Sequence, residues 1–520
     1  MQLKIADTFN KELPSDTNLS NTRRKVFGAM YSYVKPRVPK SPKLIHVSPE
    51  MCENIGIHED EVGSEEFLNI FSGSELYKET QPYAMAYAGH QFGNWAGQLG
   101  DGRAINLFEV QHNKKRWAMQ LKGAGETPYS RQGDGLAVLR SSVREYLCSE
   151  AMHHLGVPTT RVLSLMLSGD EVLRDMLYNG NAAYEKGAIV CRVAPTFIRF
   201  GNFELFASRN DIDNLKKLTD YTIKHFYPEL GAPSKEVYIQ FFKAVTDKTL
   251  EMIIHWQRVG FVHGVMNTDN MSILGQTIDY GPYGWLEGFD FGWTPNTTDR
   301  EHKRYRYGNQ PNIALWNLLQ LANALYPLVE EAEPFETILN QYQKDFEDEF
   351  LDMMRSKLGL DTKVEGDKQL IEDLEDCLLI SETDMTIFYR LLSNYQKGNI
   401  DEGLKIVEDA FYNSEEIKGD KKKKWEAWFN AYDKRVNSEP LTDSERRLKM
   451  DAVNPKYVLR NYMAQLAIDK ANEGDYGLID DMFKMLKNPY RNQPEYQKWF
   501  AKRPEWARHK VGCSMLSCSS

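Results

Sequence analysis

The sequence predicts an α+β fold in which a small β-rich unit is followed by a mainly helical one. Residues 89–103 carry five glycines and lead into two short segments with the alternating pattern of strands. From residue 211 onward, apolar residues recur mostly at the spacing of amphipathic helices. At 520 residues the chain exceeds the ~250–300 residues at which a single core stops growing, so more than one core is expected.

Composition narrows the possible setting and partners. The net charge is −10 and the pI about 5.7, so the overall field repels polyanions and no nucleic-acid partner is expected. No apolar run approaches the ~20 residues of a membrane span, so no membrane partner is expected either. The six cysteines are scattered without a CxxC pair, which suits a reducing compartment and predicts a cytoplasmic protein. Cys513 and Cys518 stand on a small, polar tail that is either an exposed-thiol segment or a frayed terminus.

Residues 89–122 predict a turn and two strands in a fixed order. The glycine-rich turn is followed by a strand at 104–110, a polar turn at 111–116 and a strand at 117–122 that ends in Lys122. Glycine clusters mark many turns, so the cluster alone would be weak evidence. The complete order is the one found in the smaller lobe of a protein kinase.

A helix is predicted after this strand pair, because apolar residues recur every fourth position from Leu139 to Leu155 and Gly156 follows. Glu145 lies off the apolar stripe and could form an ion pair with Lys122. Alternatively, Ser142 and Glu145 have the spacing of a capping box. The preceding strand ending in lysine favours the ion pair.

Residues 263–281 form the stretch around which the rest of the chain is organised. His263, Asn270 and the triplet 279–281 match the kinase pattern H-R-D-x-x-x-x-N and its downstream D-F-G. Val265 stands where a kinase has the Asp that accepts the proton of the substrate hydroxyl. The stretch therefore keeps candidate metal-binding side chains and lacks the usual base.

The segment between Asn270 and Asp279 predicts a hairpin with a two-residue turn at 275–276. Such a hairpin would bring Asn270 and Asp279 close together. With Asp269 they offer hard oxygen ligands, which Mg²⁺ prefers. Two unrelated turns would explain each piece but not their joint spacing.

Arg192 and Arg199 lie on either side of Pro195. Planar guanidinium groups suit bidentate contacts with phosphate, although two solvated surface arginines would give the same pattern. The chain before residue 80 is rich in prolines between 33 and 42, which prevent helix formation and predict an arm across a larger body.

Later segments are predominantly helical in prediction. Two helices are expected within 211–260, an irregular loop at 283–307, helices at 313–325 and about 338–354, a solvated helix start at 421–424, and a helix at 456–472 that Asn454-Pro455 opens. The predicted parts are an N-terminal arm (1–80), a smaller lobe (81–190), a larger lobe (191–330) and a helical C-terminal extension (331–520).

These motifs resemble those of the selenoprotein O family of kinase-like protein adenylyltransferases, also called YdiU. The resemblance spans most of the chain and rests on the motifs at 89–103, 121–125, 192–201, 263–281 and 454–469. It implies a protein-kinase-like bilobal fold with an N-terminal arm and a helical C-terminal extension. It also implies a reversed ATP whose AMP is transferred, with Mg²⁺ or Mn²⁺, to Ser, Thr or Tyr hydroxyls of protein substrates while pyrophosphate leaves.

The resemblance assigns roles residue by residue. Asp269 matches the proton acceptor, and Asn270 and Asp279 match the metal ligands. The positions that match nucleotide-contacting residues are Gly100, Gly102, Arg103, Lys122 with its partner Glu145, Asp134, Gly135, Arg192, Arg199 and Asp279.

Two departures from the family concern cysteines. Members with selenocysteine carry it third from the C-terminus, where this chain has Cys518. Some members have an activation-loop cysteine proposed to pair with a C-terminal one, but this chain has none between Asp279 and Arg306.

Other functions stay open at this stage. Val265 favours a nucleotide-binding pseudokinase that acts as an interaction scaffold through the acidic helical region after residue 330. A UMP transferase using Mn²⁺ is a further alternative. Ordinary phosphoryl transfer is disfavoured because no base stands at position 265, although Asp269 could substitute.

Overall fold

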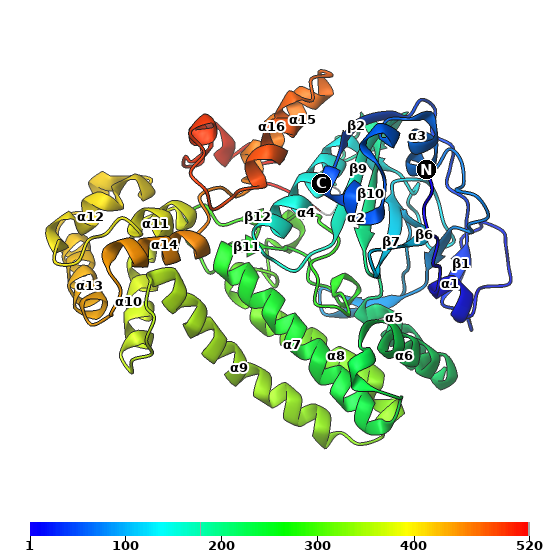
Figure 1. The fold of residues 1–520 in the computed structure, drawn as a ribbon, viewed down its shortest axis with the longest axis horizontal. Coiled ribbons are helices and arrows are strands. Elements are labelled where there is room, and N and C mark those ends of the chain that lie inside the picture. Colours follow the sequence, from blue (N-terminus) through cyan, green and yellow to red (C-terminus); the bar gives the residue numbers. More distant parts are fainter. Residues whose placement is uncertain (177, 518–520) are drawn as a thin grey trace.

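An antiparallel sheet and many helices make up this computed structural model, which describes residues 1–176 and 178–517 (Figure 1). Every strand of the main sheet comes from the first 194 residues, and helices dominate the described chain after that point. The predicted mixture of a strand-rich part followed by a helical part is therefore confirmed.

The main sheet has eight strands in the order β1-β3-β6-β7-β10-β9-β2, and β8 also pairs with β10. All its ladders are antiparallel. The first 80 residues supply both edge strands, β1 and β2, so this segment is part of the sheet. The strands are β1 (Tyr31–Tyr33), β2 (Lys43–Val47), β3 (Tyr83–Met85), β6 (Ala104–His112), β7 (Lys115–Lys122), β8 (Ala137–Val138), β9 (Arg161–Arg174) and β10 (Ala183–Ala194).

The β6–β7 hairpin confirms the two predicted strands, but the predicted polar turn was too long. Gln111 pairs with Arg116 and His112 with Lys115, so only two residues form the turn. Asn113 and Lys114 both have positive φ, 47° and 64°. This conformation matches the right-handed twist of the flanking strands, and it let the strands extend farther than hydrophobic alternation indicated.

Helix α4 (Leu139–His154) lies between the sheet and the C-terminal helices α15 (Asn461–Asn472) and α16 (Gly477–Leu486). Every residue of α4 from Leu139 to Met152 is buried, because neighbours cover it on both sides. The capping-box alternative was wrong: the helix starts at Leu139, so Ser142 lies inside it.

The predicted helices between 211 and 354 are confirmed, and each extends beyond its apolar pattern. They are α6 (Ile212–Phe226), α7 (Lys235–Val259), α8 (Gln310–Val329) and α9 (Glu333–Leu358). Among the described helices, none combines the length and the apolar character that crossing a membrane requires. The remaining elements are α1 (Phe9–Glu12), α2 (Pro49–Ile55), α3 (Glu65–Ser72), β4 (Ala88–Gln91), β5 (Asn94–Gln98), α5 (Phe200–Ala207), β11 (Phe261–Val262), β12 (Gly284–Trp285), α10 (Asp367–Ile380), α11 (Met385–Leu392), α12 (Gly403–Ile406), α13 (Asp420–Asn437) and α14 (Asp443–Val453).

Asn454 does not open a helix, contrary to the prediction. Its backbone N–H donates to Met450 O (2.8 Å) and ends α14, and its side-chain amide donates to Lys357 O (2.9 Å). The backbone N–H groups of Lys456 and Tyr457 both donate to Pro489 O. These tertiary partners hold the segment extended, and α15 begins only at Asn461.

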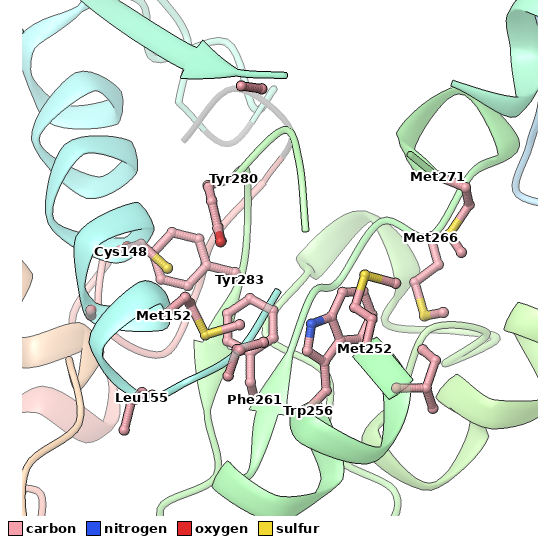
Figure 2. Close-up of a cluster of buried hydrophobic side chains, with 14 of the residues drawn as sticks. Cys148, Met152, Leu155, Met252, Trp256, Phe261, Met266, Met271, Tyr280 and Tyr283 are labelled. Atoms are coloured by element: carbon pink, nitrogen blue, oxygen red, sulfur yellow. The ribbon is translucent and has the colours of Figure 1, made fainter. Parts of the chain in front are cut away.

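A buried hydrophobic cluster supports the loop that follows β11 (Figure 2). Tyr280 and Tyr283 lie between Cys148 of α4 and Trp256 of α7, and the two tyrosine rings are 5.7 Å apart at their centroids. Tyr280 also hydrogen-bonds the hydroxyl of Thr159. Because Tyr280 directly follows Asp279, this packing fixes the backbone that carries the Asp279 carboxylate.

The C-terminal tail is packed, so the predicted exposed thiol is wrong for Cys513. Cys513 is 4% exposed, and burial raises the pKa of its thiol to about 11. Its carbonyl accepts from Asn461 Nδ2 (2.9 Å), and Thr297 N–H donates to Leu516 O (2.7 Å). Cys518 lies outside the described residues.

His255 gives the fold a pH dependence. Burial first, and then Arg258, lowers its pKa to about 4 from 6.5, and its Nδ1 accepts from Arg258 Nε (3.1 Å). Below pH 6.5 the unfolded chain binds more protons at this residue, so stability is lost as the pH falls toward 4. The contribution is at most about 1.4 kcal/mol per pH unit.

We expect the free energy of unfolding to fall more between pH 7 and 5.5 in the wild type than in His255→Gln, which keeps a hydrogen-bond acceptor without a titrating ring. Urea denaturation at both pH values measures this difference. Equal losses in the two proteins would contradict the assignment.

Candidate active site

A cleft of about 880 Å³ is lined by the sheet unit on one side and by the loops after α7 on the other. Glu145 and Arg199 lie outside its lining and contact residues that line it. The other predicted site residues all line this cleft: Gly100, Gly102, Arg103, Lys122, Asp134, Gly135, Arg192, Asp269, Asn270 and Asp279.

Lys122 and Glu145 form the ion pair that the sequence predicts. Lys122 is the last residue of β7 and 6% exposed, and its Nζ donates to Glu145 Oε2 on α4. Burial lowers the pKa of Lys122 and Glu145 opposes that effect. The other carboxylate oxygen of Glu145 accepts from Arg192 Nη1 (3.2 Å). The sheet and α4 thus hold two cations at one end of the cleft.

Asp279 connects the two predicted arginines. Arg192 Nη1 donates to its Oδ1 and Arg199 Nη1 to its Oδ2, both at 2.5 Å. Burial alone would raise the pKa of Asp279, but Arg199, Arg192 and Lys122 hold it well below its usual range. Asp279 is therefore ionised, and its φ of 55° places it in the left-handed region that Asp tolerates.

Asp269 is the second buried carboxyl of the cleft. Its Oδ2 accepts from Gln91 Nε2 (3.3 Å), while its buried Oδ1 has no hydrogen-bond partner among the described residues. Burial raises the pKa of Asp269 to about 7, although Arg199 opposes this. A carboxyl group with a pKa near neutrality can take up a proton at physiological pH.

Asn270 and Asp279 fit a hard divalent cation. Asn270 Nδ2 donates to Val265 O (2.9 Å), which leaves the amide oxygen as a ligand atom. With the ionised Asp279 and the unpartnered Oδ1 of Asp269, the cleft offers oxygen donors of the kind that Mg²⁺ and Mn²⁺ bind.

The segment joining these ligands is not the regular hairpin that was predicted. Only one antiparallel bridge forms, between Met271 and Thr277, and Gly275 N–H donates to Ser272 O (3.1 Å). The turn is thus longer than two residues. His263 Nε2 donates to Ile278 O (2.8 Å) and ties the start of the stretch to its end.

Two glycine turns form the rim of the cleft on the sheet side. Gly100 has a φ of 127° and Gly135 a φ of 71°, and a Cβ on Gly135 would lie 2.1 Å from Gly125 C. Neighbouring Asp134 accepts from both Nη atoms of Arg174 at 2.7 Å. Asp134 is thus part of the rim and paired with Arg174, a residue that the sequence did not indicate.

Asp101 and Gln91 were also missed. Asp101 is 1% exposed, lies 4.0 Å from Arg199, and has a buried Oδ1 without a hydrogen-bond partner among the described residues. Burial raises its pKa, opposed by Arg199. Its place between Gly100 and Gly102 was the available signal, whereas nothing local in the sequence links Gln91 to Asp269.

Known proteins resemble this chain over almost its entire length. The sequence model of the family described as "Protein adenylyltransferase SelO" matches residues 17–487. A "Protein nucleotidyltransferase YdiU" of Flavobacterium johnsoniae is 62% identical over 519 residues, covering 100% of this chain and 99% of the relative. The proteins of the same description from Rhodopirellula baltica and Aromatoleum aromaticum are 53% and 52% identical, each with 100% of this chain and 99% of the relative covered. The chain belongs to the SelO family of protein adenylyltransferases and is a nucleotidyltransferase.

Proposed function

We propose that this enzyme transfers AMP from ATP to a Ser, Thr or Tyr hydroxyl of a protein substrate and releases pyrophosphate. The cleft would lie between the lobes of a kinase-like bilobal fold, with residues 81–190 and 191–330 as the lobes. Residues 1–80 would form the arm and residues 331–520 the helical extension.

The observation that carries this proposal is the gathering of cations around Asp279. Lys122, Arg192 and Arg199 are all buried, and both arginines contact the Asp279 carboxylate. One carboxylate cannot neutralise three cations, so the inner end of the cleft suits a polyanion. A triphosphate directed inward, as in a reversed ATP, would supply the missing negative charge.

The reaction then follows from position and charge. The substrate hydroxyl oxygen attacks the α-phosphorus, and the bond from that phosphorus to the bridging oxygen breaks. Pyrophosphate leaves with the electron pair, and the hydroxyl proton passes to Asp269. A Mg²⁺ or Mn²⁺ ion held by Asn270 and Asp279 would neutralise phosphate charge. Val265 lines the same cleft and can accept no proton.

We expect label on protein from ATP labelled at the α-phosphorus and none from ATP labelled at the γ-phosphorus. The purified enzyme is incubated with each, with Mg²⁺ or Mn²⁺ and a bacterial lysate as acceptor, and α-labelled UTP tests for UMP transfer. Label from γ-labelled ATP would instead mean phosphoryl transfer. No label from any nucleotide, with ATP binding seen by calorimetry, would favour the pseudokinase scaffold.

A further inference from the structure

Residues 300–306, here called the basic segment, carry cationic side chains that the protein itself does not neutralise. Arg300 and Lys303 are exposed, and Arg304 and Arg306 are partly exposed. Among the described residues none of these four forms an ion pair, and the acidic residues near them are exposed Glu301 and buried Asp299. In a chain of net charge −10, unneutralised positive charge is concentrated here.

Asp299 fixes the path of the basic segment. Its carboxylate is 2% exposed and accepts from the backbone N–H groups of Arg304 (2.9 Å) and Tyr305 (2.7 Å). The Asp299 charge is thus used to hold the backbone and does not pair with the cationic side chains. The arginine and lysine heads are left for another partner.

The turn of the β4–β5 hairpin connects the basic segment to Asp269. Gln91 contacts the Asp269 carboxylate, and Phe92 N–H donates to both Asn267 Oδ1 (3.1 Å) and Tyr305 Oη (3.0 Å). A Cβ added to Gly93 would lie 3.2 Å from Arg304 Cζ. Three consecutive residues therefore reach from the proposed proton acceptor to the basic segment, a backbone length of about 7 Å.

An aromatic stack holds Arg304 at that place. The guanidinium lies 4.7 Å from the ring centroid of Trp316 on α8, His90 lies 5.4 Å from Trp316, and Trp95 lies 5.0 Å from His90. Trp95 is 44% exposed. The buried Nε of Arg304 has no hydrogen-bond partner among the described residues. The surface beside the cleft thus combines a fixed arginine, further cations and an exposed aromatic ring.

We infer that this surface selects protein substrates whose modified hydroxyl is flanked by acidic residues, which dock on the basic segment. The inference rests on the proposed function, because it names the acceptor for that same site. An extended chain advances about 3.3 Å per residue. Acidic side chains within about four residues of the hydroxyl can therefore reach the basic segment while the hydroxyl lies at Asp269.

The test uses three synthetic peptides that each contain one Tyr and differ only in the flanking residues, which are Glu, Gln or Lys. Binding to the full-length enzyme is measured by fluorescence anisotropy, and AMP transfer separately with α-labelled ATP. We expect the Glu peptide to bind about tenfold more tightly than the Gln peptide at low salt, with the preference declining in 0.5 M NaCl. The Lys peptide should bind most weakly.

Variants of exposed residues assign the preference to the surface. Arg300→Glu with Lys303→Glu should reverse it, and Arg300→Gln with Lys303→Gln should remove it, while ATP binding stays unchanged. Lys422→Glu with Lys423→Glu is the matched control, because these exposed lysines of α13 already pair with Glu426 and Asp420. That control should keep the wild-type preference.

The outcomes separate the inference from the proposed function. Equal binding of the Glu and Gln peptides would overturn the inference, whatever the label shows. A Glu preference without transfer of α-label would leave the docking surface standing and count against AMP transfer. A single-stranded DNA oligonucleotide that displaces the Glu peptide equally well would show a general polyanion site and overturn acidic-substrate selection.

Discussion

Asp279→Asn is expected to reduce AMP transfer by at least about a thousandfold while the protein stays folded. The substitution removes the negative charge that Arg192 and Arg199 both contact at 2.5 Å, and with it a proposed metal ligand. Asn tolerates the left-handed φ of 55° as Asp does, so the backbone need not move. Transfer is measured with α-labelled ATP at saturating Mg²⁺.

The same substitution carries a cost in stability that has to be separated from its effect on transfer. Taking one partner from a buried ion pair costs about 3 kcal/mol, because the remaining charges stay buried. Typical domains are stable by about 5–15 kcal/mol, so the variant should remain folded at 25 °C. Urea denaturation measures this loss directly.

Asp384→Asn is the matched control. Asp384 is fully buried and accepts from both Nη atoms of Arg460, at 2.7 Å and 2.9 Å, outside the cleft lining. It should lose comparable stability and keep its transfer activity. If Asp279→Asn transferred AMP as fast as this control, Asp279 would have no role in the reaction.

The parts of the site that follow from element order could be predicted from the sequence. A strand ending in Lys122 and a helix beginning near Leu139 are local patterns, and together they bring Lys122 to Glu145. The spacing from Asn270 to Asp279 is likewise local, so both residues were expected in one cleft and line one cleft. What fixed these contacts was the short path of the chain.

The remaining contacts depend on residues far apart in the sequence. Gln91 and Asp269 meet across 178 positions, and no local pattern of either residue indicates the other. Asn454 has the composition of a helix start, yet the carbonyl groups of Met450 and Lys357 hold it at a helix end. Cys513 looked exposed because its neighbours are small and polar, whereas Asn461 of α15 hydrogen-bonds its carbonyl and helps bury it.

Lys122→Met is expected to reduce AMP transfer by about a hundredfold to a thousandfold with a small change in stability. The ammonium group is one of the three buried cations proposed to face the phosphates. When it is removed, Glu145 still accepts from Arg192 at 3.2 Å, so its charge is not left unpaired. Met fills similar volume, so the free energy of unfolding should change by less than about 2 kcal/mol.

Lys357→Met is the control that separates the charge of Lys122 from the effect of removing any buried lysine. Lys357 is 2% exposed, and its Nζ donates to Arg258 O (2.8 Å) above the ring of Tyr389, outside the cleft lining. Burial lowers its pKa well below the usual value, so Met replaces a side chain whose charge is already disfavoured. This control should transfer AMP at the wild-type rate. If Lys122→Met also kept its rate to within threefold, the phosphates would not lie at Lys122, and the reversed nucleotide would lose its main support.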